Sequence, residues 1–196
     1  MKTIATKDER KMIIMKTRKA VVSFVALIMV ASLLGGFCIP AFAAAGDDLV
    51  AVAQNELKNY PNGRKPYKTG TWCARFVSWC GKQAGIPIPN SAGVSRFWEG
   101  YAGNNPNYKL HLKSDDDGYI PQPGDLIVWR DKAGKLKDGR KYPRSTRSNG
   151  KGRSHIGIVE KVVGDTVYAI EGNSDKKVKS KTYKLWVNTT GYVSYL

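Results

Sequence analysis

Cysteine and histidine are scarce in this chain, with three and two copies among its 196 residues. Acidic residues are few beside basic ones, 16 Asp and Glu against 32 Lys and Arg, so the formal net charge is +16. Hydrophobic residues are not lacking: they make up 42% of the chain and include five Trp and ten Tyr. This content supports a packed core and excludes a chain that is disordered throughout. The length allows one domain of ordinary size with a short appendage.

The N-terminus is predicted to be a secretory signal peptide and not part of that core. Residues 15–19 (MKTRK) are positively charged, residues 20–34 form an apolar run, and residues 41–43 (AFA) have the small-x-small pattern that signal peptidase cleaves. The run is short for a membrane anchor, which needs about 20 apolar residues. We therefore predict a signal peptide at residues 1–43 and a secreted domain at residues 44–196, with no stable membrane association after cleavage.

The predicted mature domain is strongly basic. Removing residues 1–43 takes seven basic and two acidic residues from the totals of 32 and 16, which leaves a net charge of +11. A secreted domain with this charge suits an anionic partner, and charge alone leaves three open: a wall that bears teichoic acid, a membrane surface or extracellular nucleic acid. Residues 130–153 hold ten Lys and Arg and two Asp. We expect this segment to be an irregular connection, either functional or simply solvated.

The two cysteines of the mature chain are not expected to form a disulfide with each other. Cys73 and Cys80 both lie in the segment WCARFVSWCGKQA, whose apolar residues recur at helical spacing. Residues seven apart on a helix are about 10.5 Å apart along its axis, whereas a disulfide needs Cα atoms within about 7 Å. Unpaired thiols in an exported protein call for an explanation, and a nucleophile is one that an oxidising compartment permits.

Cys73 is the better placed of the two thiols for nucleophilic catalysis. The helix is predicted to start just before it, with Thr71 as the N-cap, so the first-turn N–H groups and the helix dipole favour a thiolate. Cys80 lies two turns further on and is expected to be a small buried residue. Of the two histidines, His111 falls in an irregular stretch and is expected at the surface. His155 begins a predicted strand and is the candidate general base.

A third polar group should hold the imidazole of His155 in one tautomer and one orientation. Glu171 and Asn173, in the sequence IEGNS at the end of the next predicted strand, are the side chains placed to do so. Separately, each of them also fits an ordinary residue of a turn at the end of a strand.

The register of the predicted hairpin decides whether Glu171 can reach His155. The turn is predicted at Gly164 and Asp165. Because side chains alternate along a strand, a strict two-residue turn would place Glu171 on the face opposite to His155. We therefore predict a three-residue turn or a β-bulge between Glu160 and Glu171, with a carboxylate oxygen of Glu171 within hydrogen-bond distance of His155. In a regular hairpin, Asn173 would be the remaining candidate.

The order of the patterns predicts an α+β domain in which N-terminal helices pack on an antiparallel sheet. Residues 103–118 are expected to be irregular. Helices are expected after Asp47, from Thr71 to Gly85, and after Ser91. Strands are expected at residues 125–129, 155–163 and 166–171 and once or twice within residues 181–196.

Four segments occur in a fixed order along the mature chain: TWCARFVSWCGKQAGIP, YIPQPGDLIVW, SHIGIVEKV and YAIEGNS. Together they resemble the CHAP family, the cysteine- and histidine-dependent amidohydrolases and peptidases of peptidoglycan metabolism. The resemblance covers nearly all of the mature chain and implies a papain-like CHAP fold for residues 44–196. It implies that Cys73 is the nucleophile and His155 the base, and it matches Glu171 and Asn173 to the other polar members of the site.

The resemblance implies a secreted or wall-associated peptidoglycan hydrolase that cleaves an amide bond through a thioester on Cys73. The bond stays open between the muramoyl–alanine amide and a peptide bond of the stem or cross-bridge. We expect peptidoglycan as the partner, teichoic acid bound through the basic surface, no nucleic acid, no cofactor and a monomeric chain. We assign no metal, because the run Asp115-Asp116-Asp117 lacks the alternating spacing of a calcium loop.

Two other hypotheses remain. One is a papain-like cysteine peptidase that acts on protein. The other is a non-catalytic basic module that binds cell wall or nucleic acid, for which Cys73 would be dispensable and binding would depend on salt. The complete set of Cys, His, Glu and Asn residues argues against the second hypothesis.

Overall fold

The computed structural model describes residues 41–100, 108–115, 118–136, 138–145 and 153–195. They belong to one folded unit, residues 40–196. The predicted signal peptide, residues 1–43, lies almost entirely outside the described residues and stays a prediction. Within the described part of the chain, no helix is long and apolar enough to cross a membrane.

Helix α2 (Ala41–Asn59) begins earlier than expected. We predicted its start after Asp47, whose side chain could cap a helix, but the helix already includes the alanine-rich run before that residue. Alanine has the highest helix propensity of all residues, which accounts for the extension. The predicted cleavage point after Ala43 therefore falls inside α2, with residues 44–59 on its C-terminal side.

Helix α3 (Cys73–Gln83) buries Cys73, Phe76, Val77 and Cys80 on one face, as the apolar spacing predicted. The predicted N-cap was wrong. Trp72 occupies the N-cap position and makes no side-chain capping bond, so Cys73 is the first residue of the helix.

The C-terminus of α3 is where the sequence placed it. Gly85 has a positive φ of 70°, a left-handed conformation that glycine adopts without a steric penalty. The Ile86 N–H donates to the Gly81 carbonyl (2.9 Å) and the Gly85 N–H to the Lys82 carbonyl (3.3 Å). These two bonds are the pair of a Schellman motif, which satisfies the last carbonyls of the helix.

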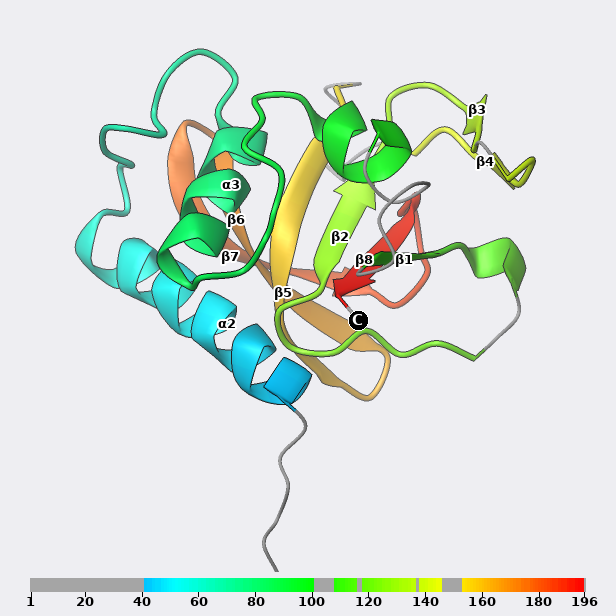
Figure 1. Ribbon diagram of the computed structural model, residues 1–196, viewed down its shortest axis with the longest axis horizontal. Helices are drawn as coiled ribbons and strands as arrows, with labels where there is room; N and C mark the ends of the chain where they lie inside the picture. Colours follow the sequence, from blue (N-terminus) through cyan, green and yellow to red (C-terminus); the bar gives the residue numbers. More distant parts are fainter. Residues whose placement is uncertain (1–40, 101–107, 116–117, 137, 146–152, 196) are drawn as a thin grey trace, which may run out of the picture. The chain divides into compact units, whose positions relative to one another are not determined.

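A six-stranded antiparallel sheet forms the rest of the domain (Figure 1), which confirms the predicted α+β class. Its strand order is β1-β8-β2-β5-β6-β7, with β7 at one edge. A separate pair, β3 (Gly134–Lys135) and β4 (Lys141–Tyr142), lies within the basic segment that we expected to be irregular. The six strands are β1 (Tyr108–His111), β2 (Leu126–Trp129), β5 (His155–Val163), β6 (Thr166–Ser174), β7 (Lys177–Lys184) and β8 (Gly191–Tyr195).

The two faces of the sheet support separate hydrophobic clusters. Helices α2 and α3 pack together against β5 and β6 on one face (Figure 1), where Ile156, Ile158 and Ile170 are fully buried. Residues of the opposite parity form the second cluster, which contains Trp129 and Val159. This alternation follows from the two-residue period of a strand.

Two expectations for the middle of the chain were wrong. Strand β1 lies in the stretch expected to be irregular, and His111, at its end, is 2% exposed instead of lying at the surface. The imidazole of His111 stacks on Tyr119 with ring centroids 3.4 Å apart, and its Nε2 lies 2.9 Å from Ser194 Oγ. Strand β1 pairs only with β8, more than 80 residues further along the chain, so its stability comes from tertiary pairing.

Candidate active site

Strand β6 packs closely against the first turn of α3. A Cβ atom added to Gly172 would lie 2.3 Å from the Cβ of Phe76, so the backbone of β6 touches the side chain three residues after Cys73. The first turn of α3 and the start of β5 lie at the same end of the sheet (Figure 1). The fold thus carries Cys73 and His155 to one end of the domain, next to the strand that bears Glu171.

The segment before Cys73 is anchored by a buried carboxylate. Glu56, which is 0% exposed, accepts two hydrogen bonds from the Arg64 guanidinium (2.8 and 3.0 Å) and one from the Tyr67 hydroxyl (2.7 Å). The Tyr67 ring packs on Trp72, with centroids 5.6 Å apart. Because a buried carboxylate is stable only when it is paired, these contacts fix the chain as it enters α3.

His155 and Glu171 form a buried pair. The imidazole Nε2 lies 3.0 Å from Oε2 of Glu171, and the two residues are 3% and 0% exposed. The other carboxylate oxygen, Oε1, accepts a hydrogen bond from the Tyr183 hydroxyl. Trp129 packs beside both rings, with centroids 5.8 Å from His155 and 4.8 Å from Tyr183. We assign the proton of neutral His155 to Nε2, facing the carboxylate, which leaves Nδ1 as the basic nitrogen.

A β-bulge produces this contact, as predicted. The turn keeps the regular pairing of Val163 with Thr166, but the register shifts between Val159 and Lys161. The extra residue in β5 is Glu160, whose carboxylate accepts a 2.8 Å hydrogen bond from Gln54 on α2.

Beyond the bulge, Ile158 pairs with Ile170, so Glu171 lies across from Gly157 and on the face of His155. A Cβ atom on Gly157 would lie 3.0 Å from Cγ of Glu171, which shows how closely the carboxylate crosses this glycine. The predicted bulge and the predicted hydrogen bond are both confirmed.

Asn173 lies just past Glu171 and is half-buried. Its φ is 60°, and β6 shifts register against β7 between Glu171 and Ser174. Asparagine tolerates this left-handed conformation better than other non-glycine residues, so the backbone alone gives a reason for Asn at this position. Among the described residues, the carboxylate of Glu171, and not the side chain of Asn173, accepts the hydrogen bond from Nε2 of His155.

Cys80 is the buried residue that the helical pattern predicted. It is 0% exposed and is not joined to Cys73 by a disulfide. Burial raises the pKa of the Cys80 thiol well above its ordinary value, and the nearby Glu56 carboxylate acts in the same direction. A thiol kept protonated inside the core cannot serve as a nucleophile.

Neither Tyr183 nor Trp129 was predicted from the sequence to belong to the site. Tyr183 lies on a strand whose start we misplaced, and Trp129 pairs with His155 only through the register of β2 and β5. The alternation in KVKSKTYK could have indicated the strand, but not its partner. The described residues contain no group of three or more His, Cys, Asp or Glu side chains that could hold a metal ion.

A model of the CHAP domain matches residues 62–173, which is more than half of the chain. This chain belongs to the CHAP family. The matched range contains Cys73, His155, Glu171 and Asn173, so the resemblance noted from the four segments is confirmed.

Two solved structures resemble this CHAP protein. The crystal structure of Ly7917 has a TM-score of 0.45 and 13% sequence identity, and the match covers 76% of this chain and 62% of Ly7917. The crystal structure of Ly7917 with the hydrolyzing product of MDP has a TM-score of 0.41 and 13% identity, with 74% and 62% coverage. The CHAP chain thus spans less than two thirds of the length of Ly7917. No curated protein sequence matches it.

Proposed function

We propose that this CHAP protein is an exported hydrolase that cleaves an amide bond of peptidoglycan, with Cys73 as nucleophile and His155 as general base. The observation that carries the proposal is the buried contact between His155 and Glu171 at the end of the sheet where α3 begins with Cys73. The family, the predicted export and the high positive charge favour peptidoglycan over protein as the substrate.

The proposed reaction is acyl transfer. His155 Nδ1 takes the proton of the Cys73 thiol, and the thiolate attacks the amide carbonyl. The carbonyl oxygen becomes an oxyanion near the first turn of α3, where backbone N–H groups point out of the helix. The imidazolium then gives its proton to the nitrogen of the leaving amine as the C–N bond breaks. Water, deprotonated by His155, hydrolyses the thioester and restores the thiol.

Glu171 acts on this reaction through His155, and it is therefore a positioning residue. Its carboxylate holds the imidazole in one tautomer and stabilises the positive charge that the ring acquires when it takes the proton. Tyr183 in turn holds the carboxylate by donating to its other oxygen. Asn173 remains a candidate for a polar contact with substrate, because it lies beside this pair and is half-buried.

The test is digestion of purified peptidoglycan followed by mass spectrometry of the released fragments. A new amino group on the stem peptide together with free muramic carboxylate would identify the muramoyl–alanine amide as the bond, and shortened stems or cross-bridges would identify a peptide bond. Hydrolysis of a protein substrate with peptidoglycan left intact would contradict the proposal.

The close packing of Gly172 on α3 makes a prediction about this geometry. In Gly172→Ala the new methyl group would overlap the Cβ of Phe76, 2.3 Å away, so the first turn of α3 must move away from β6. We expect a loss of stability of about 1–3 kcal/mol and a fall in kcat larger than the rise in KM. Gly93→Ala is the matched control, because its new Cβ makes only ordinary contacts of 3.6 Å or more. Equal activity of the two variants would contradict the prediction.

The β3–β4 pair gives the basic segment a defined surface. Lys135 and Lys141 are both exposed and lie directly opposite each other. Like charges in this position destabilise a strand pair, so their presence favours an anionic partner. Arg140 is different: its guanidinium binds Asp115 (2.7 Å) and Asp138 (2.8 Å), which gives it a structural role.

Replacing Lys135 and Lys141 together by Gln should weaken binding to walls that bear teichoic acid and flatten its dependence on salt. Turnover of a small soluble muropeptide should stay within about twofold, because these exposed, screened charges take no part in the acyl transfer and act on association. Gln at Lys58 and Lys82, which are exposed at the ends of α2 and α3, gives the same change in net charge as a control. Sedimentation with walls across a salt series measures the effect. Identical curves for the two double variants would show that the hairpin has no special part in binding.

A further inference from the structure

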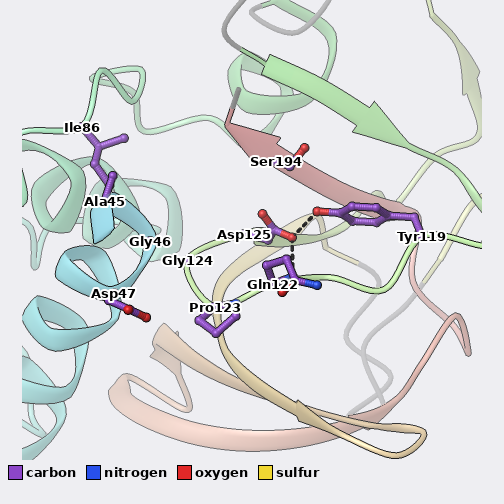
Figure 2. Close-up of a pocket in the computed structure, with 10 residues that line it drawn as sticks. All are labelled: Ala45, Gly46, Asp47, Ile86, Tyr119, Gln122, Pro123, Gly124, Asp125 and Ser194. Carbon is purple, nitrogen blue, oxygen red and sulfur yellow. Dashed lines mark hydrogen bonds between the residues drawn. The ribbon is translucent and has the colours of Figure 1, made fainter. Parts of the chain in front are cut away.

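A cavity of about 440 Å³ lies at the N-terminal end of α2, and none of the proposed catalytic residues lines it. Figure 2 shows it between the first turns of α2, the turn before β2 and strand β8. Ala45, Ile86 and Pro123 give it apolar walls, and Tyr119, Asp125 and Ser194 bring polar groups to it.

The first turn of α2 and the turn before β2 pack backbone to backbone beside the cavity. Gly46 of α2 and Gly124 of the turn approach so closely that a Cβ on Gly124 would lie 2.4 Å from the Cα of Gly46. A Cβ on Gly46 would likewise lie 2.4 Å from the carbonyl oxygen of Pro123. Since two glycines permit this direct contact of backbones, the distance between α2 and the turn is fixed.

Asp125 presents half of a buried carboxylate to this space. The residue is 5% exposed, and its Oδ2 accepts hydrogen bonds from the Tyr119 hydroxyl (2.5 Å) and the Gln122 N–H (2.7 Å). In the described part of the chain, no donor reaches Oδ1. Figure 2 shows this oxygen pointing away from Tyr119 and Gln122, toward the side where Ser194 lies. Burial raises the pKa of Asp125 to about 7 against the effect of these hydrogen bonds, so the carboxylate is short of compensating charge.

The residues that line the cavity indicate which kind of positively charged group would compensate the Asp125 carboxylate. The lining contains two carboxylates, Asp47 and Asp125, and no Lys or Arg side chain, in a chain with a net charge of +16. Calcium and magnesium ions prefer six or more oxygen ligands, which these mostly apolar walls do not offer. A primary ammonium group needs only a few acceptors, and its hydrocarbon part would suit the walls.

We propose that this cavity binds the primary ammonium group of a small ligand, with Asp125 as its counter-ion and Ala45, Ile86 and Pro123 against its hydrocarbon part. Oδ1 of Asp125 accepts from the ammonium, and the hydroxyl oxygen of Ser194, which also lines the cavity and lies 2.9 Å from His111 Nε2, offers a second acceptor. This site is separate from the proposed peptidoglycan hydrolysis and does not depend on it.

Two sources can supply the ammonium group. One is a free small amine. The other is the α-amino group of Ala44, which the predicted cleavage after Ala43 would create one residue before Ala45, a residue of the cavity wall. The chemistry is the same in both cases, so the experiment first tests for the ammonium group and then for its source.

The test is a titration followed by NMR, with n-propylammonium chloride as the probe and 1-propanol as the neutral control of similar shape. Saturable shifts of the amide signals of Ala45, Gly46 and Asp125 are expected with propylammonium and not with propanol. Asp125→Asn should weaken binding by about tenfold or more, because a hydrogen bond between two charged groups is replaced by a neutral one.

Asp125 also accepts two hydrogen bonds in its turn, so Asp125→Asn could disturb the fold. Ala45→Leu keeps those bonds and fills the cavity, and it should abolish binding. Ala51→Leu, on the exposed face of the same helix, is the matched control and should bind as the unchanged chain does. Binding that persists in folded Asp125→Asn or in Ala45→Leu would overturn the proposal.

Comparing the full chain with the exported, processed chain identifies the source. Equal binding of propylammonium by the two forms indicates a free amine. If the processed chain does not bind propylammonium but binds it once its amino group is acetylated, the source is the amino group of Ala44. If neither form binds the probe in a manner that depends on Asp125, and acetylation changes nothing, the proposal is wrong.

Discussion

Replacing Cys73 by alanine should abolish hydrolysis of purified peptidoglycan. Without the thiol no thioester can form, and loss of a nucleophile of this kind costs roughly 10⁴-fold or more in kcat. The first turn of α3 should survive the change, because alanine has a high helix propensity and Trp72, not Cys73, holds the N-cap position. Sedimentation with cell walls should therefore be unchanged. The measurement is release of soluble muropeptides alongside a binding assay on the same preparation.

Cys80→Ala is the internal control, because it removes a thiol from the same helix face. Cys80 is fully buried, so the variant should lose stability by about 1–2 kcal/mol through a small cavity. Its activity below the melting temperature should match that of the unchanged chain. Equal loss of activity in folded Cys73→Ala and Cys80→Ala would contradict the assignment of the nucleophile.

Replacing Glu171 by glutamine should lower kcat by about 10²- to 10⁴-fold with little change in KM. The amide keeps the shape of the side chain but removes the charge that stabilises the imidazolium, and its NH₂ group can turn toward Nε2 and force the proton onto Nδ1. Because Glu171 is 0% exposed, water cannot replace the lost carboxylate. Steady-state kinetics on a soluble muropeptide would separate kcat from KM.

Tyr183→Phe gives a graded form of the same test. It removes the hydrogen bond to Oε1 of Glu171 and leaves the contact between Glu171 and His155 in place. A loss of about tenfold is expected, close to the value of one hydrogen bond to a charged group. If Glu171→Gln stays active while Asn173→Ala loses kcat, then Asn173 and not Glu171 holds the imidazole.

Local patterns in the sequence predicted the parts of the site that depend on local chemistry. The spacing of apolar residues placed the Cys73 helix, and Gly85 marked its end. The alternation of side chains along the hairpin was enough to require a bulge before Glu171 could meet His155. These rules depend on residues close together in the chain, which a single sequence displays directly.

The errors arose where distant pairing decides the structure. Strand β1 has only four residues, and its partner β8 lies more than 80 residues further along the chain, so no local signal predicts the burial of His111. Tyr183 lies on β7, which pairs with β6 on the side away from β5, and its hydroxyl donates to Glu171. Predicting this contact requires the register of β7, whose start was misplaced. The N-cap was misplaced for another reason: Thr71 is a residue type that favours the N-cap position, but the helix begins one residue later, after Trp72, whose side chain makes no capping bond.

Part of the positive charge of the protein lies on β7, at the edge of the sheet, where it can act without a bound ligand. An edge strand exposes unpaired backbone groups that can recruit a strand from another molecule. Lysines at positions 177, 179, 181 and 184 line this edge strand. Two copies of the protein that meet edge to edge would therefore bring like charges together. This repulsion opposes the pairing of one edge strand with another.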